Sequence, residues 1–216
     1  MKAKLIFLAA ATAIVVFSCK NKPAKSEATV PVRVSETPAP VVSEYHKYGI
    51  KSGIVTFETA MMGMKIKSVL YFDDYGQKEA DEKYSGDHIK SIDICTGKER
   101  FVLKPDTKTA LSNGECTQGV SYRFSWDEVS KADPSYKPEK LPNMTVAGKD
   151  CESFSIEHAS EVTVYAGWQN ICLYLKTPAA GSFVIKQAVS IEENVQIPAE
   201  KFQVPSDYQV KKMGEL

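Results

Sequence analysis

Hydrophobic and polar residues alternate along two neighbouring runs of the chain. In residues 64–72 the even positions are Met, Ile, Ser, Leu and Phe, and in residues 50–59 Val55 and Phe57 share one side of a similar alternation. A period of two residues is typical of a β-strand with one covered face. Because Gly63 lies between the two runs and suits a tight turn, the pattern predicts a β-hairpin.

The same alternation recurs along the rest of the chain, interrupted by short turns rich in Asp, Gly and Asn. About ten strands joined in this way predict an antiparallel meander in a mainly β (α+β) domain. Further strands are expected at residues 77–84, 89–94 and 100–104. Four later runs are also expected to be strands, because each places its apolar residues on one face. The residues that share a face are Phe154 with Ile156; Val162 with Val164 and Ala166; Ile171 with Leu173 and Leu175; and Phe183 with Ile185, Val189 and Ile191.

The middle of the chain departs from this pattern. Ser125 and Glu128 have the spacing of a capping box, in which side chains bind free backbone N–H groups at the start of a helix. A short helix is therefore expected to run from residue 125 to about residue 132. Three prolines follow between residues 134 and 142, and they predict a segment without regular structure because proline lacks the backbone N–H. One helical turn is expected at residues 198–201, which begin with proline.

The N-terminus carries a different pattern. Two lysines precede an uncharged apolar run, residues 5–17. The run is too short to cross about 30 Å of hydrocarbon as a helix, but it has the length of a signal-peptide core. Residues 16–19 (Val-Phe-Ser-Cys) look like a lipobox, so residues 1–18 are expected to be a signal peptide and Cys19 a lipidated N-terminus. The alternative is an ordinary cleaved signal followed by an incidental cysteine.

Lys20 follows the expected lipidated cysteine. In lipoproteins that this one resembles, Asp at that position retains the protein in the inner membrane, and an acidic tag sends some lipoproteins to the cell surface. Residues 20–23 contain neither, which favours lipid anchoring to the outer membrane with the domain facing the periplasm. Stable anchoring requires more than one acyl chain, and the triacylated cysteine implied by the resemblance meets that requirement.

Composition separates a tether from a folded domain. Residues 20–43 are rich in Pro, Ala, Ser, Thr and Lys and lack aromatic residues, which is typical of a flexible spacer. Residues 44–216 suit a single domain. The whole chain has 27 basic and 27 acidic residues, and the domain has a slight acidic excess without a basic stripe. A nucleic-acid partner is therefore not expected.

Four cysteines remain in the domain once Cys19 is set aside: Cys95, Cys116, Cys151 and Cys172. An even number of cysteines in an exported domain indicates disulfides, and four cysteines allow three connectivities. Pairing of sequence neighbours, Cys95 with Cys116 and Cys151 with Cys172, is preferred, and free buried thiols are the alternative. The absence of a CxxC pair disfavours a thioredoxin-like motif or a zinc ribbon.

The sequence offers little catalytic chemistry. His46, His88 and His158 lie far apart beside polar residues, and surface positions are expected for all three. Asp73 and Asp74 precede Tyr-Gly and fit a turn better than an acid/base pair. No nucleophile elbow, zinc-protease motif or phosphate-binding loop is present. We therefore expect no catalytic residue, metal site or cofactor, and a protein that is not an enzyme.

Residues 61–64 (Met-Met-Gly-Met) are unusual for a hairpin tip. Methionine side chains are adaptable and favoured at apolar binding surfaces. Two interpretations stay open: a tip that touches a lipid or a partner protein, or a tip that folds under a helical cap and packs in the core.

The turns and strand ends of the domain resemble those of a group of uncharacterised bacterial exported proteins, and their layout is similar to the LolA/LolB lipoprotein-carrier superfamily. The resemblance covers roughly residues 48–210 and implies a curved antiparallel sheet, an open half-barrel with short helices on its concave side. Residues 126–142 do not match a helical lid, and four domain cysteines are more than these carriers usually have. The motifs are residues 48–53 (YGIKSG), 61–64 (MMGM), 71–76 (YFDDYG), 146–151 (VAGKDC) and 191–205 (IEENVQIPAEKFQVP).

The resemblance further implies a concave face that binds or carries a lipid or another hydrophobic ligand. The alternative function is a non-enzymatic structural lipoprotein that binds an envelope protein. The ordinary explanation of alternating apolar residues, a packed core, also remains open for each candidate lining residue. These candidates are Phe57, Met64, Ile66, Leu70, Phe72, Val164, Leu173, Phe183 and Ile185.

Overall fold

The computed structural model describes residues 46–116, 123–131 and 135–212. The expected signal peptide, the lipidated Cys19 and the tether lie outside the described residues. Residues Ser43–Leu216 form one compact unit. Within the described part of the chain, no helix has both the length and the apolar character needed to span a bilayer.

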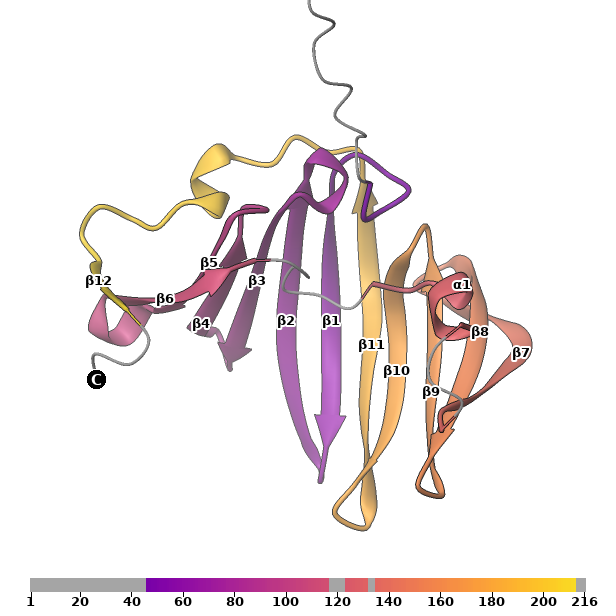
Figure 1. The fold of residues 1–216 in the computed structure, drawn as a ribbon. Coiled ribbons are helices and arrows are strands. Elements are labelled where there is room, and N and C mark those ends of the chain that lie inside the picture. Colours follow the sequence, from indigo (N-terminus) through magenta and orange to yellow (C-terminus); the bar gives the residue numbers. More distant parts are fainter. Residues whose placement is uncertain (1–45, 117–122, 132–134, 213–216) are drawn as a thin grey trace, which may run out of the picture. The chain divides into compact units, whose positions relative to one another are not determined.

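Twelve strands form one curved, open sheet in the order β12-β6-β5-β4-β3-β2-β1-β11-β10-β9-β8-β7 (Figure 1). Neighbouring strands are antiparallel except β12 and β6, which are parallel. The mainly β, antiparallel prediction is confirmed, although the alternation alone does not predict β6, β7 or β12. The strands are β1 (Gly53–Met61), β2 (Met64–Asp73), β3 (Lys78–Ser85), β4 (His88–Cys95), β5 (Glu99–Lys104), β6 (Thr109–Glu115), β7 (Lys137–Val146), β8 (Lys149–His158), β9 (Glu161–Trp168), β10 (Ile171–Ala179), β11 (Ser182–Glu193) and β12 (Gln209–Lys212).

Two meanders meet at the centre of the sheet. Strands β1 to β6 pair in sequence order on one side, and strands β7 to β11 pair in sequence order on the other. The first and last of these strands, β1 and β11, then pair with each other from Gly53 opposite Glu193 to Met61 opposite Val184. Contacts between residues far apart in the sequence therefore hold the two halves together.

The sheet buries one face at its centre. Phe57, Leu70 and Phe72 alternate on the same side of β1 and β2, and all three are almost completely buried. We call this side the inner face. On the other side, which we call the outer face, Glu58 and Gln187 lie opposite each other on β1 and β11 and are exposed. The apolar inner face is the expected result of a strict two-residue alternation.

The outer face of β3 to β6 is covered by residues 194–208, which we call the C-terminal strap. Ile197 and Phe202 of the strap are buried against apolar residues of these strands. Lys201 lies 2.5 Å from the buried Glu82 of β3. The strap leads into β12, so the end of the described chain closes the edge of the first meander.

Helical structure in the described residues is limited to one short α-helix and three 3-10 turns. Ser125 Oγ accepts a hydrogen bond from the Glu128 backbone N–H at 3.4 Å, which confirms the predicted helix start. The Glu128 carboxylate pairs with Arg123 instead of returning to the cap. The expected helical cover is thus reduced to a single turn of α-helix. The elements are α1 (Trp126–Val129), η1 (Asp74–Gly76), η2 (Pro105–Thr107) and η3 (Ala199–Phe202), the last at the predicted turn.

The proline-rich segment is a strand, which corrects the expectation of irregular structure. Pro138 and Pro142 both lie within β7, at one edge of the sheet. An edge strand tolerates proline because its outer backbone groups have no ladder partner. The register also shifts between Leu141 and Met144, beside the second proline.

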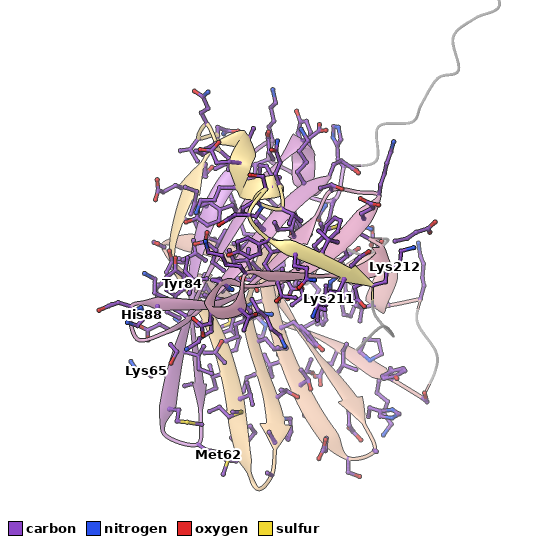
Figure 2. All side chains as sticks on the ribbon, turned by 90° about the vertical axis from the view of Figure 1, so that its left-hand side faces the viewer. Met62, Lys65, Tyr84, His88, Lys211 and Lys212 are labelled. Carbon is purple, nitrogen blue, oxygen red and sulfur yellow. A yellow bond between two sulfur atoms is a disulfide. The ribbon has the colours of Figure 1, made fainter. Side chains whose placement is uncertain are left out.

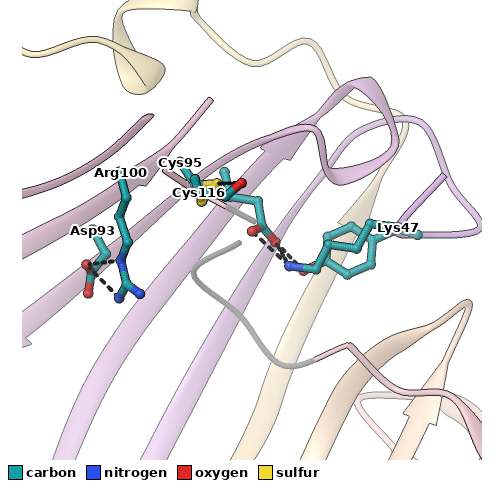
Figure 3. Close-up of a disulfide and its surroundings, with 7 residues drawn as sticks. Lys47, Asp93, Cys95, Arg100 and Cys116 are labelled. Carbon is teal, nitrogen blue, oxygen red and sulfur yellow. Dashed lines mark hydrogen bonds and ion pairs between the residues drawn. A yellow bond between two sulfur atoms is a disulfide. The ribbon is translucent and has the colours of Figure 1, made fainter. Parts of the chain in front are cut away.

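Only one of the two preferred cysteine pairings is formed. Cys95 and Cys116 make a disulfide that ties the end of β4 to the residue after β6 (Figure 3). Cys151 and Cys172 are free and buried, which corrects the second pairing. By the two-residue alternation along each strand, Cys151 shares a face with Ser153 of β8, whereas Cys172, opposite Gly167, lies on the other face.

Candidate functional site

The inner face has two halves with different character. The upper half lies beside η1 and residues 46–50, and the lower half lies toward the tips of hairpins β1–β2 and β10–β11 (Figure 1). The upper half is filled by the chain's own side chains, whereas the lower half is apolar and partly exposed.

Tyr48 fills the apolar part of the upper half. Its side chain is completely buried, and its ring lies edge-on to Phe72 with 4.8 Å between the centroids. Its backbone N–H donates to the Tyr75 carbonyl at 3.0 Å. Gly76 makes room for the ring, because a Cβ there would lie 2.7 Å from a ring carbon, and the glycine has a φ of +84°. The segment before β1 is therefore fixed over the inner face.

A buried ion pair lies beside Tyr48. Lys47 Nζ is 2.8 Å from both carboxylate oxygens of Glu79, and the two residues are 4% and 0% exposed (Figure 3). The Tyr48 hydroxyl donates a further hydrogen bond to Glu79. Burial lowers the pKa of Lys47, and the charge of Glu79 opposes that shift. Buried charges of this kind require both a partner and full hydrogen bonding, which this cluster supplies.

A second charged cluster continues across β3 to β5. Asp81 and Asp93 lie directly opposite each other, a repulsive arrangement unless cations compensate. Asp93 contacts Lys83 at 2.8 Å and Arg100 at 3.1 Å. Asp81 Oδ1 is buried without a hydrogen-bond partner, and burial raises the pKa of Asp81, although Lys186 and Lys83 act in the other direction. The inner face of the first meander is therefore polar as well as buried.

The lower half carries an exposed apolar surface. Ile66 and Met64 lie on the inner face of β2, in the same alternation as Leu70, and are 38% and 55% exposed. Cross-strand pairs extend this surface from Met64 through Met61 to Val184, and from Ile66 through Thr59 and Lys186 to Leu175 and Tyr165. We call the apolar residues of this surface the lower inner patch: Met61, Met64, Ile66, Ile156, Tyr165, Leu175 and Val184.

Lys186 marks the upper boundary of the lower inner patch. Its Nζ lies 4.4 Å from the centroid of the Phe57 ring, on the inner face. A cation over an aromatic face keeps its alkyl stem on apolar surface and its charge toward the solvent side. A positive group thus stands where the apolar surface gives way to the charged clusters.

A separate polar cleft of about 500 Å³ lies beside α1. Both tryptophans of the chain line it, Trp126 and Trp168, together with the carboxylates of Asp127, Asp150 and Glu152. Its base is formed by Phe124 packed against Gly167, where a Cβ would lie 2.2 Å from the Phe124 ring. Its charged lining makes it a poor site for an apolar ligand.

The predicted lining residues do not share one surface. Phe57, Met64, Ile66, Leu70 and Phe72 lie on the inner face, but Phe57, Leu70 and Phe72 are buried, so only Met64 and Ile66 remain accessible. Three others face the opposite way, since they pair with or follow outer-face positions: Val164, Phe183 and Ile185. The ninth, Leu173, is buried in the main core cluster beside an irregularity of β10.

The alternation does not identify the second side of the patch. Tyr165 and Val184 sit on the inner face, next to residues that were expected to face inward, and Leu175 sits there on the face predicted for it with Leu173. In β11 a β-bulge explains the difference, because Thr56 lies opposite Ser190 while Phe57 lies opposite Ala188. One extra residue reverses the face of every side chain beyond it. The aromatic or branched character of these residues is the only local signal.

The histidines and the Asp73–Asp74 pair lie at turns and near the surface of the described residues. Within them, no group of three or more His, Cys, Asp and Glu side chains is placed to hold a metal ion. His46 stacks on Tyr75 and His158 on Tyr136, both near the surface. Asp73 accepts a hydrogen bond from the Asp74 backbone N–H at 2.8 Å, as a turn residue does.

The methionine tip is exposed. Met62 is 67% exposed at the turn of the β1–β2 hairpin, and Met64 is 55% exposed one step along β2. The interpretation in which this tip folds under a cap is therefore wrong. The tip lies at the lower end of the inner face, next to the lower inner patch.

Comparison with known proteins bears on the fold alone. No protein-family model matches the chain, and no curated protein matches it in sequence. An uncharacterised conserved protein from Thermus thermophilus superposes with a TM-score of 0.53 at 9% identity, over 76% of this chain and 91% of that one. A chain of the MucA/MucB complex of Pseudomonas aeruginosa superposes with a TM-score of 0.51 at 13% identity.

The match to the MucA/MucB complex covers 75% of this chain and 58% of the other. This chain therefore spans a little over half of the length of that relative. Both likenesses support a LolA-like fold, in agreement with the curved antiparallel sheet. At these identities they carry no residue-level correspondence.

Proposed function

We propose that this protein is a membrane-anchored binding module of the bacterial cell envelope that holds a hydrophobic ligand on its lower inner patch. It acts by binding, without a catalytic step. Lipidation at Cys19 attaches it to the periplasmic side of the outer membrane, and residues 20–43 allow the domain to stand away from the bilayer.

One observation carries this proposal: the lower inner patch is apolar, reaches across six strands and is partly exposed to solvent, most of all at Met64 and Ile66. Soluble domains rarely leave contiguous apolar surface of this kind uncovered unless something binds there. The upper half cannot serve the same purpose, because Tyr48 and the ion pair of Lys47 with Glu79 occupy it. The ligand site is accordingly half of the concavity that the fold suggests.

The position of Lys186 favours an amphipathic ligand. An apolar chain on the lower inner patch would end near this ammonium, whose charge acts on the buried Asp81 and would also attract a carboxylate or phosphate head group. The patch is a surface rather than an enclosed cavity, so part of the ligand remains in contact with water. We therefore expect modest affinity and ready exchange.

A second candidate function is the binding of an envelope protein. The complex of MucB with MucA involves a chain of the same fold, and an open apolar surface also suits the side chains of a protein segment. Photo-cross-linking from position 66 in intact cells distinguishes the two. One dominant protein adduct would favour this second function, and adducts with lipid would favour the first.

The direct test uses protein purified from membranes and a dansylated fatty acid as the probe. We expect the probe to bind, and Ile66→Glu to weaken binding by at least about tenfold, because its carboxylate would lose hydration against the ligand. Val189→Glu is the matched control, since Val189 is 49% exposed but lies on the bulge of β11 away from the patch.

Native mass spectrometry of the same preparation should show a co-purifying apolar ligand that Ile66→Glu removes. Equal probe binding by both variants would overturn the proposal of a hydrophobic ligand. The proposal would also be overturned if probe binding were too weak to saturate and the protein purified from membranes carried no ligand.

A further inference from the structure

Two neighbouring hairpin tips at the lower end of the sheet, those of β1–β2 and β10–β11, contain no acidic residue. Residues 59–66 and 177–185 include a single charged side chain, Lys65. We call these two tips together the hairpin rim. Figure 2 shows Met62 at the extreme end of its hairpin and Lys65 set back along the strand.

The two tips lie side by side. Met61 pairs with Val184 in the register of β1 and β11, which brings the turn of one hairpin next to the start of the other strand. Three large apolar side chains protrude from this end: Met62 is 67% exposed, Met64 is 55% exposed and Phe183 is 47% exposed. Protruding apolar side chains on adjacent tips form a contiguous surface, which isolated exposed residues do not.

Lysines are set back from the apolar end at one level. Lys65 has a side chain 74% exposed, and Lys176 Nζ lies 4.3 Å from the centroid of the Phe183 ring. Lys186 follows one register step further along β11, and Lys67 lies two positions beyond Lys65 on β2. The nearest acid on β1 is Glu58, which pairs with Lys65 at 3.0 Å. On these two hairpins the excess charge at this level is positive, whereas the neighbouring β8–β9 tip carries Glu161.

We propose that the hairpin rim docks on the surface of an anionic lipid bilayer. Apolar side chains at the tip would enter the boundary between head groups and acyl chains, and the lysines would meet the phosphates just above it. This layering of apolar tip and cationic collar matches the order of groups met on entering a membrane from water. Each lysine near an anionic surface contributes to such binding, and the contribution falls with added salt.

The charge pattern selects a bilayer over a protein partner. A protein partner would need acidic groups placed around an apolar pocket to match this end. An anionic membrane presents negative head groups above an apolar interior at every point of its surface. Penetration is limited to side chains, because the backbone groups at the turns around Gly63 and Gly181 would lose their water if they went deeper.

The hairpin rim shares Met61, Met64, Ile66 and Val184 with the lower inner patch, whereas Met62 and Phe183, the apolar residues changed in the docking test, lie outside the patch. The first described residues lie at the other end of β1, which is about 30 Å long for its nine residues. A docked sheet would stand on its hairpins and present the open edge of the patch to the bilayer.

The test uses the full mature chain with Cys19→Ser, which removes the lipid, in co-sedimentation with vesicles. We expect binding to an equal mixture of phosphatidylcholine and phosphatidylglycerol, and much less to phosphatidylcholine alone. The double variant Met62→Asp/Phe183→Asp should lower the affinity at least about tenfold, and Lys65→Gln/Lys176→Gln about tenfold on the anionic vesicles. Met62, Lys65 and Phe183 are exposed and Lys176 is half-buried, so the variants should keep their circular dichroism spectra.

Val210→Asp and Lys211→Gln are the matched controls, because Val210 is 55% exposed on β12, at the far edge of the sheet (Figure 2). Both should bind as the parent does. Tryptophan at position 62 should show a blue-shifted emission and quenching by brominated lipid. Two results would overturn the proposal. The first is vesicle binding by the rim variants that equals that of the parent, which is expected if the basic tether alone binds the vesicles. The second is emission from the tryptophan at position 62 that shows neither the blue shift nor the quenching.

Discussion

The ammonium of Lys47 lies 2.8 Å from each carboxylate oxygen of Glu79, inside the protein. The two residues are 32 positions apart, one in the segment before β1 and the other on β3. The pair therefore fastens the entry of the chain to the inner face of the first meander. Its stability consequences can be measured directly.

Glu79→Gln should strongly destabilise the fold. The variant keeps an acceptor for the Tyr48 hydroxyl but removes the Glu79 charge from the buried Lys47, and breaking a buried pair costs about 3–5 kcal/mol of unfolding free energy. Urea denaturation followed by circular dichroism measures the change. Glu58→Gln, which breaks the exposed pair with Lys65, should cost less than about 1 kcal/mol. Equal effects of the two variants would show that the Lys47 site is hydrated.

Asp81→Asn should stabilise the protein at neutral pH by about 1 kcal/mol, because the variant removes the charge of a buried carboxylate whose Oδ1 has no hydrogen-bond partner. Burial raises the pKa of Asp81. Between the ordinary pKa of Asp and the raised value, the native state binds more protons than the unfolded state, so stability falls as pH rises through this window.

The advantage of Asp81→Asn should therefore disappear as the pH falls below the ordinary Asp pKa, about 3.9. Denaturation curves at neutral and acidic pH measure it. Glu139→Gln, an exposed position on β7, serves as the control and should show no such trend. A destabilised Asp81→Asn at neutral pH would mean that Lys83 and Lys186 outweigh burial.

The free thiols should be inert in the native protein. Burial raises the pKa of Cys172 to about 12 and also raises the pKa of Cys151. Because the thiolate is the reactive form, iodoacetamide at mildly alkaline pH should modify neither residue until urea is added. Cys95 and Cys116 should react only after reduction. Rapid labelling of the folded chain, counted by mass spectrometry, would contradict this.

Phe202→Ala should release the C-terminal strap. Phe202 is 6% exposed in the outer-face cluster, and truncating a buried phenylalanine costs about 3–5 kcal/mol. Chemical denaturation measures the loss, and hydrogen exchange should show faster opening of β12. Val210→Ala, at a position 55% exposed, should change stability by no more than about 0.5 kcal/mol.

The sequence is sufficient to predict strands where alternation is uninterrupted. Residues 64–72 form β2 with the predicted faces, and Ser125 caps α1 as its spacing with Glu128 requires. Pro138 and Pro142 lead to the wrong prediction of an irregular segment. The cost of proline in a strand depends on whether the strand lies at an edge, and edge position is a property of the whole sheet.

The candidate site is only partly predictable for a related reason. Met64 and Ile66 follow from alternation, but Phe183 and Ile185 are misplaced because the extra residue near Val189 is visible only once β1 pairs with β11. Which face of the sheet a side chain occupies depends on the register of its strand, and that register is set by the partner strand. The buried charges have no local signal either, since Glu79 depends on Lys47, far away in the sequence.

The central pairing of β1 with β11 also sets an order of folding events. Each meander can form from local hairpins, whereas the pairing of β1 with β11 requires the closure of a long loop, which is slow. A chain exported N-terminus first would expose the unpaired edge of β1 until almost all of the chain had crossed. In a chain exported in that order, the first meander would be a half-sheet prone to aggregation until β11 pairs with β1, and its maturation would then depend on a factor that shields that edge.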